Sequence, residues 1–277
     1  MCGDGANDCT ALKTADVGLS LSDAEASIAA PFTSKTPDIS STIFLLRQGR
    51  ASLDLSYSMF KYVMVMSATQ FSSMAILHYT TCNLDDMQFG FINMTIIFPM
   101  LFMICTMETS RVLSPELPFR SLLNKSMIIS IIGHSILMVI GQIIAYIIVR
   151  QEDYFEPVNK GHEFETEGYE STAVFLASTP QFMYIGIIYS IFTPFRQRLY
   201  KNLLFVLTVI LMAAITYWVI LAPLGFMKNE LELQRLDFDF RLTLAGITVA
   251  NGLANIGFES LLVYYFGYSE KREVNPA

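Results

Sequence analysis

The chain has 277 residues, of which 53% are hydrophobic and only 16% are charged. Its mean hydropathy of +0.45 is unusual for a soluble domain and typical of a protein that crosses a membrane several times. The formal net charge of −7 argues against a nucleic-acid partner, because such proteins neutralise phosphates with a basic surface.

The first predicted element, within residues 1–39, is a polar turn that reads Gly3-Asp4-Gly5-Ala6-Asn7-Asp8. The carboxylates of Asp4 and Asp8 suit a turn that holds Mg²⁺ beside a phosphoryl group, because Mg²⁺ takes few protein carboxylates and keeps room for phosphate oxygens and water. Glycine allows close backbone approach, and the N-terminus of the helix expected at about Asn7–Thr14 favours negative charge. The same residues also fit an ordinary turn.

A short strand is expected next, at Val17–Leu21, followed by a connecting segment that Pro31 and Pro37 interrupt. From Ser40 onward, apolar residues recur at helical spacing with charged residues between them. This pattern predicts a cytosolic stalk helix over residues 40–61 that continues directly into the first membrane span.

Residues 62–266 contain six apolar runs, each long enough to cross about 30 Å of hydrocarbon, which needs about 20 residues. The runs lie at about 62–82, 87–107, 126–149, 172–195, 202–226 and 242–266. The first five contain no Asp, Glu, Lys or Arg, and the sixth contains only Glu259. The predicted fold class is therefore an α-helical multi-pass membrane bundle, followed by a cytosolic tail at 267–277.

The orientation of the predicted spans in the membrane follows if the turn at Asp4 faces ATP in the cytosol. The loops at about 108–125 and 196–201 and the tail then lie in the cytosol, where a modest excess of Lys and Arg agrees with the positive-inside rule. Glu259 would lie nearer the cytosolic end of its span, where we expect it to reach the interface or to pair with another helix.

A second polar turn separates the first two predicted spans. It carries Asp85, Asp86 and Gln88, and Asn93 follows one helical turn later. Polar and ionisable residues at membrane depth are costly and usually functional, so these four are candidates for a cation path. The alternative for Asp85 and Asp86 is a simple short lumenal loop.

The run GDGANDCTALKTADVGLSLSDAEASIAAPF resembles the end of the phosphorylation domain of P-type ATPases, an α/β domain of the HAD-like fold. The resemblance implies that Asp4 binds Mg²⁺, that Asn7 contacts the phosphoryl group, and that Asp8 supports the metal site. It also implies ATP hydrolysis through an aspartyl-phosphate intermediate. The family's nucleophile lies in an Asp-Lys-Thr-Gly-Thr motif that these residues lack, as they lack a nucleotide-binding domain. The chain alone is therefore predicted to be inactive.

The strings CGDGANDC, AEASIAAPFTSK and LHYTTCNLDDMQFGFIN, together with Phe60-Lys61-Tyr62, resemble the B subgroup of type V P-type ATPases. Members of that subgroup export polyamines from late endosomes, lysosomes or vacuoles, which implies a polyamine cargo and a membrane of that kind, although another endomembrane or the plasma membrane stays open. The family usually has Asp where Asn93 stands. The loss of this carboxylate weakens the attraction for a polycation, although an amide oxygen still accepts hydrogen bonds.

Two alternatives stay open beside a polyamine pump. The first is a pump of the same superfamily that moves an inorganic cation, and the second is a truncated, catalytically dead membrane protein translated from Met1. We expect Met1 to be an internal residue, so that the chain is the C-terminal part of a longer protein. Membrane lipid and a cationic small molecule are the expected partners, and no obligatory subunit is implied.

Overall fold

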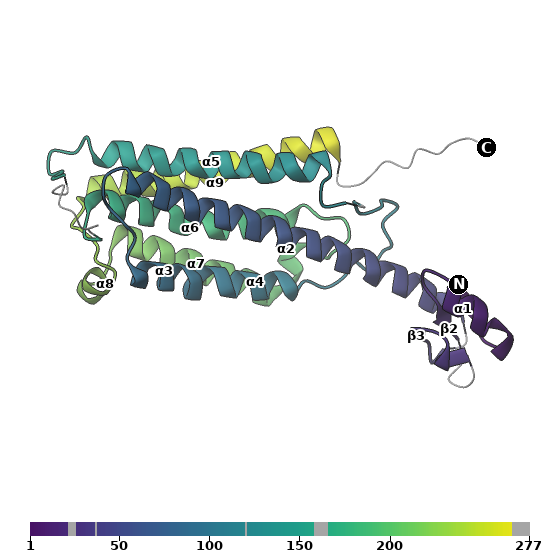
Figure 1. Ribbon diagram of the computed structural model, residues 1–277. Helices are drawn as coiled ribbons and strands as arrows, with labels where there is room; N and C mark the ends of the chain where they lie inside the picture. The colour runs from purple at the N-terminus through teal and green to yellow at the C-terminus, as the bar shows by residue number, and fades with distance from the viewer. Residues whose placement is uncertain (22–25, 37, 120, 158–165, 268–277) are drawn as a thin grey trace.

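The computed structural model describes residues 1–21, 26–36, 38–119, 121–157 and 166–267 (Figure 1). Most of the predicted tail at 267–277 lies outside these residues, as does part of the connecting segment before the stalk. Most of the described chain is helical, and a small α/β piece stands at the far end of one long helix.

The α/β piece contains a three-stranded parallel sheet in the order β1-β2-β3. The strands are short: β1 at Cys2–Gly3, β2 at Leu19–Ser20 and β3 at Phe32–Thr33. The strand expected at Val17–Leu21 is therefore present but covers only two residues. Because the strands are parallel, the turn after β1 lies at the carboxyl edge of the sheet, where α/β folds commonly bind ligands.

Short helical segments complete this piece. The 3₁₀ turns η1 and η2 cover Ala6–Asp8 and Ala26–Ile28, and helix α1 covers Cys9–Thr14. The helix predicted at about Asn7–Thr14 thus begins as a 3₁₀ turn and becomes α-helical at Cys9. Leu12 of α1 is buried, which attaches the helix to the sheet behind the turn.

Helix α2 runs without interruption from Ser40 to His78, a length of about 58 Å at 1.5 Å per residue. Its first half extends between the α/β piece and the bundle, and its second half packs against other helices of the bundle (Figure 1). The structure has one unbroken helix of 39 residues over the predicted stalk and most of the predicted first span.

Five other helical stretches are long and apolar enough to cross a membrane, judged over the described residues. They are Asp86–Cys105, Lys125–Val149 (α5), Tyr169–Ile191 (α6), Leu203–Leu221 (α7) and Phe238–Phe266 (α9). The first is divided into α3 (Asp86–Ile92), the π-helical segment η3 (Asn93–Ile97) and α4 (Phe98–Cys105). The short segments η4 (Leu199–Lys201) and α8 (Gly225–Glu230) flank α7.

Helix α2 is not among these five, so the sixth span at about 62–82 stays a prediction. The physical reason lies in its composition, because this half of α2 contains a series of polar residues that lower its hydropathy: Ser67, Thr69, Gln70, Ser72 and Ser73. Thr69, Ser72 and Ser73 are buried against the bundle rather than exposed on its surface. This half of α2 therefore packs among the other helices with its polar side chains buried between them, although its surface is not fully apolar.

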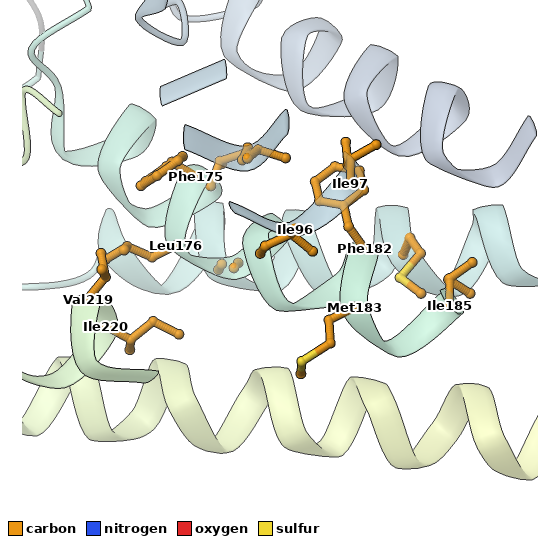
Figure 2. Packing of buried hydrophobic residues seen from close by; sticks show 14 of the residues in the cluster. Ile96, Ile97, Phe175, Leu176, Phe182, Met183, Ile185, Val219 and Ile220 are labelled. Atoms are coloured by element: carbon orange, nitrogen blue, oxygen red, sulfur yellow. The ribbon is translucent and has the colours of Figure 1, made fainter. Parts of the chain in front are cut away.

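Helix α6 forms the centre of the bundle. In its most apolar window 83% of the residues are buried, against 28–33% in the other four stretches. Figure 2 shows Phe175 and Phe182 of α6 packed with Ile96 of η3 and Val219 of α7. By contrast, α5 exposes a stripe of isoleucines, such as Ile132 and Ile136, on its outer face, as expected for a helix that borders lipid.

A buried ion pair connects α2 to the segment after α6. Asp54 Oδ2 accepts hydrogen bonds from Arg196 Nε at 2.8 Å and from Thr193 Oγ1 at 2.6 Å. Arg196 Nη2 donates to Ser58 Oγ at 2.7 Å and to the carbonyl of Tyr189 at 3.1 Å. This ion pair therefore fixes α2 at the point where the helix enters the bundle.

We expect the substitution Asp54→Ala to destabilise the protein by about 3–5 kcal/mol, because it leaves the buried Arg196 guanidinium without a counter-charge. The measurement is unfolding of the purified chain in mixed micelles. The double substitution Asp54→Leu with Arg196→Met, which removes both charges and keeps apolar volume, should recover most of the loss. Equal destabilisation by Asp54→Ala and by Ser52→Ala, on the exposed face of α2, would show that the ion pair does not matter.

Candidate functional site

The turn between β1 and α1 brings Asp4, Asn7 and Asp8 into one loop. Asp8 Oδ2 accepts hydrogen bonds from the backbone N–H of Asp4 at 3.2 Å and of Gly5 at 3.4 Å. The carboxylate of Asp8 therefore holds the backbone of its own turn, as in an N-terminal helix cap.

The two glycines leave room for these side chains. A Cβ atom at Gly3 would lie 2.5 Å from Asp8 Oδ2, and one at Gly5 would overlap Asn7 Oδ1. Larger residues at either position would displace the polar groups of the turn, so the glycines serve close packing of backbone against side chain.

Asp4 and Asn7 are exposed at this turn, whereas Asp8 is partly buried. A ligand at the carboxyl edge of the sheet can therefore reach the carboxylate of Asp4 and the amide of Asn7 directly. The described residues contain no group of three or more His, Cys, Asp or Glu side chains that could hold a metal ion. Two hard oxygen donors on one turn fit Mg²⁺, which commonly takes one or two carboxylates and completes its shell with phosphate and water.

The predicted cation-path residues lie at the start of α3, on α3 and on η3, in the part of the bundle opposite the Asp4 turn (Figure 1). Asp85 is the N-cap of α3, because its Oδ2 accepts from Met87 N at 2.8 Å. Asp86, in the first turn, is exposed, and Asn93 is partly buried. No hydrogen bond joins the side chains of Asp85, Asp86, Gln88 and Asn93 to one another in the described part of the chain.

Gln88 is different, because its side chain is completely buried. Its Nε2 donates to the carbonyl of Leu231 at 2.8 Å, while its Oε1 has no partner among the described residues. An unsatisfied acceptor in an apolar setting is costly and needs a physical reason. A ligand that brings N–H donors would satisfy this oxygen.

The π-helical segment η3 begins at Asn93 and ends just before Phe98 and Pro99 of α4. Proline lacks an N–H and crowds the preceding turn, so a wider turn relieves the helix here. Single π-helical turns inside α-helices are frequent at functional sites, and this one follows Gln88 by one turn.

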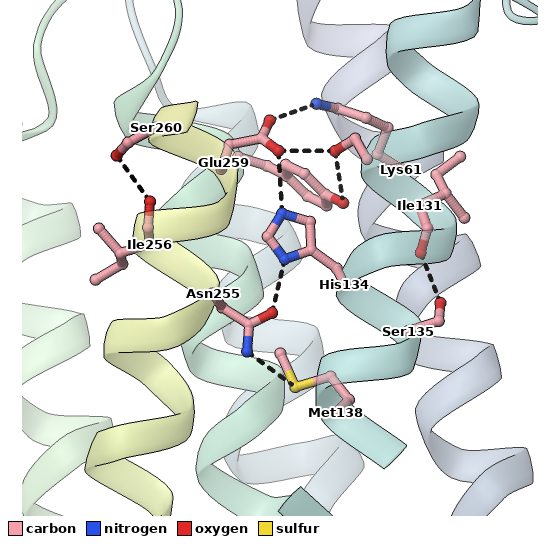
Figure 3. Close-up of polar contacts among 11 residues, drawn as sticks. Lys61, Ile131, His134, Ser135, Met138, Asn255, Ile256, Glu259 and Ser260 are labelled. Carbon is pink, nitrogen blue, oxygen red and sulfur yellow. Dashed lines mark hydrogen bonds and ion pairs between the residues drawn. The ribbon is translucent and has the colours of Figure 1, made fainter. Parts of the chain in front are cut away.

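Sequence reasoning missed the polar cluster shown in Figure 3, which lies between α2, α5 and α9. Glu259 Oε1 pairs with Lys61 Nζ at 3.2 Å, and its Oε2 contacts Ser130 Oγ at 2.9 Å and His134 Nε2 at 3.0 Å. His134 Nδ1 contacts Asn255 Oδ1 at 2.7 Å. Of the two roles expected for Glu259, pairing with another helix is the one observed.

The aromatic ring of Tyr189, from the central helix α6, closes this cluster. Lys61 Nζ lies 4.1 Å from the centroid of that ring, a cation–π contact, and the ring of His134 meets it edge to face at 5.5 Å. The ammonium group of Lys61 is therefore shared between a carboxylate and an aromatic face.

A chain of amide and hydroxyl groups continues from this cluster across the bundle. Asn255 Nδ2 donates to the Asn251 carbonyl at 2.8 Å, and Gln181 Nε2 reaches Asn251 Oδ1 at 3.3 Å. Gln142 Nε2 donates to Gln181 Oε1 at 3.2 Å, and Ser72 Oγ to Gln142 Oε1 at 2.8 Å. Ser72 in the polar half of α2 is thus bonded to Gln142 of α5, from which the chain of hydrogen bonds continues to α6 and α9.

One signal in the sequence points to the faces of two helices that contribute to this network, but not to their partners. Asn251, Asn255 and Glu259 recur every four residues in the last span, and Ser130, His134 and Met138 do so in the third. Residues four apart share one face of a helix, so each span has a polar stripe that must face another helix rather than lipid.

We expect Lys61 and Glu259 to be strongly coupled in a double-mutant cycle of Lys61→Met and Glu259→Ala. Each single substitution leaves a buried charge unpaired and should cost about 3–5 kcal/mol, while the double variant should cost much less than their sum. The measurement is unfolding in mixed micelles. Ser260→Ala is the matched control on α9, because Ser260 is exposed and bonds only to Ile256 of its own helix. Additive effects of the two single substitutions would contradict the pairing.

Comparison with known proteins agrees with these features. No family model matches the chain. The chain is 33% identical over 282 residues to the polyamine-transporting ATPase 13A3 of Homo sapiens, in an alignment that covers 94% of the chain and 23% of that protein. It is 36% identical over 265 residues to the polyamine-transporting ATPase 13A2 of Homo sapiens, with 95% and 22% covered.

A yeast protein is also similar. The vacuolar cation-transporting ATPase YPK9 of Saccharomyces cerevisiae is 35% identical over 208 residues, which are 75% of the chain and 14% of that protein. The chain therefore spans less than a quarter of the length of these curated relatives. Because about a third of its residues match over nearly the whole chain, it belongs to the P-type ATPases, the family of these polyamine- and cation-transporting relatives.

Proposed function

We propose that this chain is part of an ATP-driven pump that moves a polyamine across an endomembrane through an aspartyl-phosphate intermediate. In this proposal residues 1–39 end the phosphorylation domain, residues 40–61 form the stalk, and residues 62–266 form six membrane helices. The observation that carries the proposal is the exposed Asp4 turn at one end of the unbroken helix α2, whose other end is buried in the bundle.

At the Asp4 turn, the chain's own residues bind and orient a phosphoryl group. Asp4 would hold Mg²⁺, Asn7 would donate an amide hydrogen to a phosphoryl oxygen, and Asp8 keeps the turn in place through its backbone hydrogen bonds. The Mg²⁺ supplies positive charge that offsets the charge of the transferred phosphoryl group. The nucleophilic Asp and the site for ATP would lie in other parts of the pump, so the 277 residues alone should not hydrolyse ATP.

At the opposite end, Asp85, Asp86, Gln88 and Asn93 would form the path of a cationic solute. A polyamine brings several N–H donors and positive charges, and the unsatisfied Gln88 Oε1 is an acceptor for such a donor. The two carboxylates at the start of α3 would attract the cation to this end of the bundle. The names of the relatives 13A3 and 13A2 support polyamine as the cargo.

An inorganic cation is the second candidate, because one residue weakens the case for a polycation. Asn93 stands where the resemblance leads us to expect a carboxylate, so the path has less charge to attract a polycation. The name of the yeast relative states only a cation and a vacuole. That name supports a vacuolar membrane for either cargo, and the lysosome and late endosome stay part of the proposal through the family resemblance.

We expect spermine to stimulate ATP hydrolysis by the complete pump that carries this sequence, reconstituted in lipid vesicles. The substitution Asp4→Asn should lower the rate at least about a hundredfold, because it weakens the only exposed carboxylate of the Mg²⁺ turn. Asp16→Asn, at another exposed aspartate of the same piece, is the control and should have little effect. Stimulation by metal ions but not by spermine would refute the polyamine proposal.

The substitution Asn93→Asp should lower the half-saturating concentration of spermine by about three- to tenfold, because it adds a negative charge to the proposed path. Spermine-stimulated ATP hydrolysis at a series of concentrations measures this effect. Asn229→Asp on the exposed surface of α8 adds the same charge outside the path and should leave the value unchanged. An equal change in both variants would mean that only general surface attraction is involved.

A further inference from the structure

A buried histidine, His134 of α5, is a titratable group that neither the Asp4 turn nor the proposed cation path uses. Its side chain is completely buried, and Glu259, which it contacts, is only 1% exposed. Both ring nitrogens are engaged: Nε2 lies 3.0 Å from Glu259 Oε2, and Nδ1 lies 2.7 Å from Asn255 Oδ1 (Figure 3). Because the ring is buried, these two oxygens decide which protonation states of His134 are favourable.

The amide of Asn255 presents its oxygen, not its nitrogen, to His134. Its Nδ2 donates to the backbone carbonyl of Asn251 at 2.8 Å. A carbonyl oxygen only accepts, so turning the amide over would place Asn255 Oδ1 against another acceptor. Asn255 Oδ1 therefore accepts from the ring, and Nδ1 of His134 carries a hydrogen.

The carboxylate of Glu259 lies on the other side of the ring and also accepts. Lys61 Nζ lies 3.2 Å from its Oε1 and Ser130 Oγ lies 2.9 Å from its Oε2, and both groups bring hydrogens. The contact between Oε2 and Nε2 of His134 needs one more proton, on either of these two atoms. Both placements give the pair the same number of protons, and the ammonium group beside Oε1 favours an ionised carboxylate with an imidazolium.

Without that proton, two acceptors face each other in each tautomer of the ring. If the remaining hydrogen stays on Nδ1, the lone pair of Nε2 meets Glu259 Oε2 at 3.0 Å. If it moves to Nε2, the lone pair of Nδ1 meets Asn255 Oδ1 at 2.7 Å. Buried acceptors that face each other without a donor are costly. The contacts between α5 and α9 are therefore complete only while the proton is present.

The other groups around His134 come from three neighbouring helices. Lys61 belongs to α2, Tyr189 to α6 and Glu259 to α9. The rings of Tyr189 and Phe258 meet the imidazole edge to face at 5.5 Å and 5.1 Å. One carboxylate thus lies between two cations, and the face of the Tyr189 ring, 4.1 Å from Lys61 Nζ, stabilises the second positive charge.

We propose that His134 and Glu259 form a proton-binding site, and that the bound proton holds α5 to α9 beside the stalk helix α2. The ligand is a single proton, which the pair shares between Nε2 and Oε2. Its loss breaks the contact with Glu259 or the contact with Asn255, and both of these join α5 to α9. Because Glu259 also pairs with Lys61, the site lies where α2 meets these two helices.

The first test is ¹⁵N NMR spectroscopy of the purified chain in mixed micelles, with labelled histidine. The chain has three histidines, so a variant that combines His78→Gln with His162→Gln leaves His134 as the only one. At about pH 7.5 both ring nitrogens should carry a hydrogen, whereas an exposed imidazole is mostly neutral. A second variant adds Lys61→Met and Glu259→Gln, which removes both charges together, and should show one nitrogen without hydrogen. A neutral ring in the first variant, or a doubly protonated one in the second, would overturn the proposal.

The second test measures unfolding in mixed micelles between about pH 7 and pH 9, where an exposed imidazole is largely neutral. Unfolding then releases the bound proton, so the unfolding equilibrium constant of the unaltered chain should rise with pH by up to about tenfold per unit more than that of His134→Gln. The double variant Lys61→Met with Glu259→Gln keeps the histidine and should lose the same pH dependence. His78→Gln, at an exposed histidine, is the matched control and should behave like the unaltered chain. Equal pH dependence in the unaltered chain and in the variants that alter the pair would contradict the proposed site.

Discussion

Helix α2 brings polar side chains and the ammonium group of Lys61 into the largely apolar interior of the bundle. In that interior a polar group without a partner is costly. The neighbouring helices supply partners: Glu259 and the ring of Tyr189 contact Lys61, and Gln142 contacts Ser72. Unpaired polar groups in such a setting cost several kcal/mol, so this requirement determines which faces of α5, α6 and α9 meet α2. The central position of α6 follows, because it contacts the polar faces of several helices at once.

These partners hold α2 to the bundle at successive levels along one helix. Asp54 binds Arg196 near the entry of the helix, Lys61 binds Glu259 two turns further on, and Ser72 binds Gln142 deeper in the bundle. The helix is therefore fixed to Arg196 and to α5 and α9 over the half that lies in the bundle, while its other half leads to the Asp4 turn.

Local features of the fold were predictable because short-range rules control them. The glycine-rich turn and the helix after it follow from glycine spacing, and the unbroken stalk follows from 39 residues without proline. The strand at Val17–Leu21 was overestimated, since only Leu19–Ser20 meets neighbouring strands in register. Among the candidate site residues, Asp85 acts as a helix cap, a role that its position before α3 favours, whereas the complete burial of Gln88 was not predictable without its neighbours. The assignment of Asp4, Asn7, Asp8 and Asn93 to chemical roles remains a prediction.

The sequence by itself determined that this protein has long apolar helices, a glycine-rich acidic turn and one acidic residue, Glu259, in its predicted last span. These properties depend on composition and on spacings of four residues or fewer. Such features belong to the sequence and do not depend on tertiary contacts. Only the tertiary structure decided which polar groups meet. His134 and Glu259 are 125 residues apart in the chain, and Lys61 and Glu259 are 198 apart. No local rule connects such residues, because only the packing of the helices brings them together.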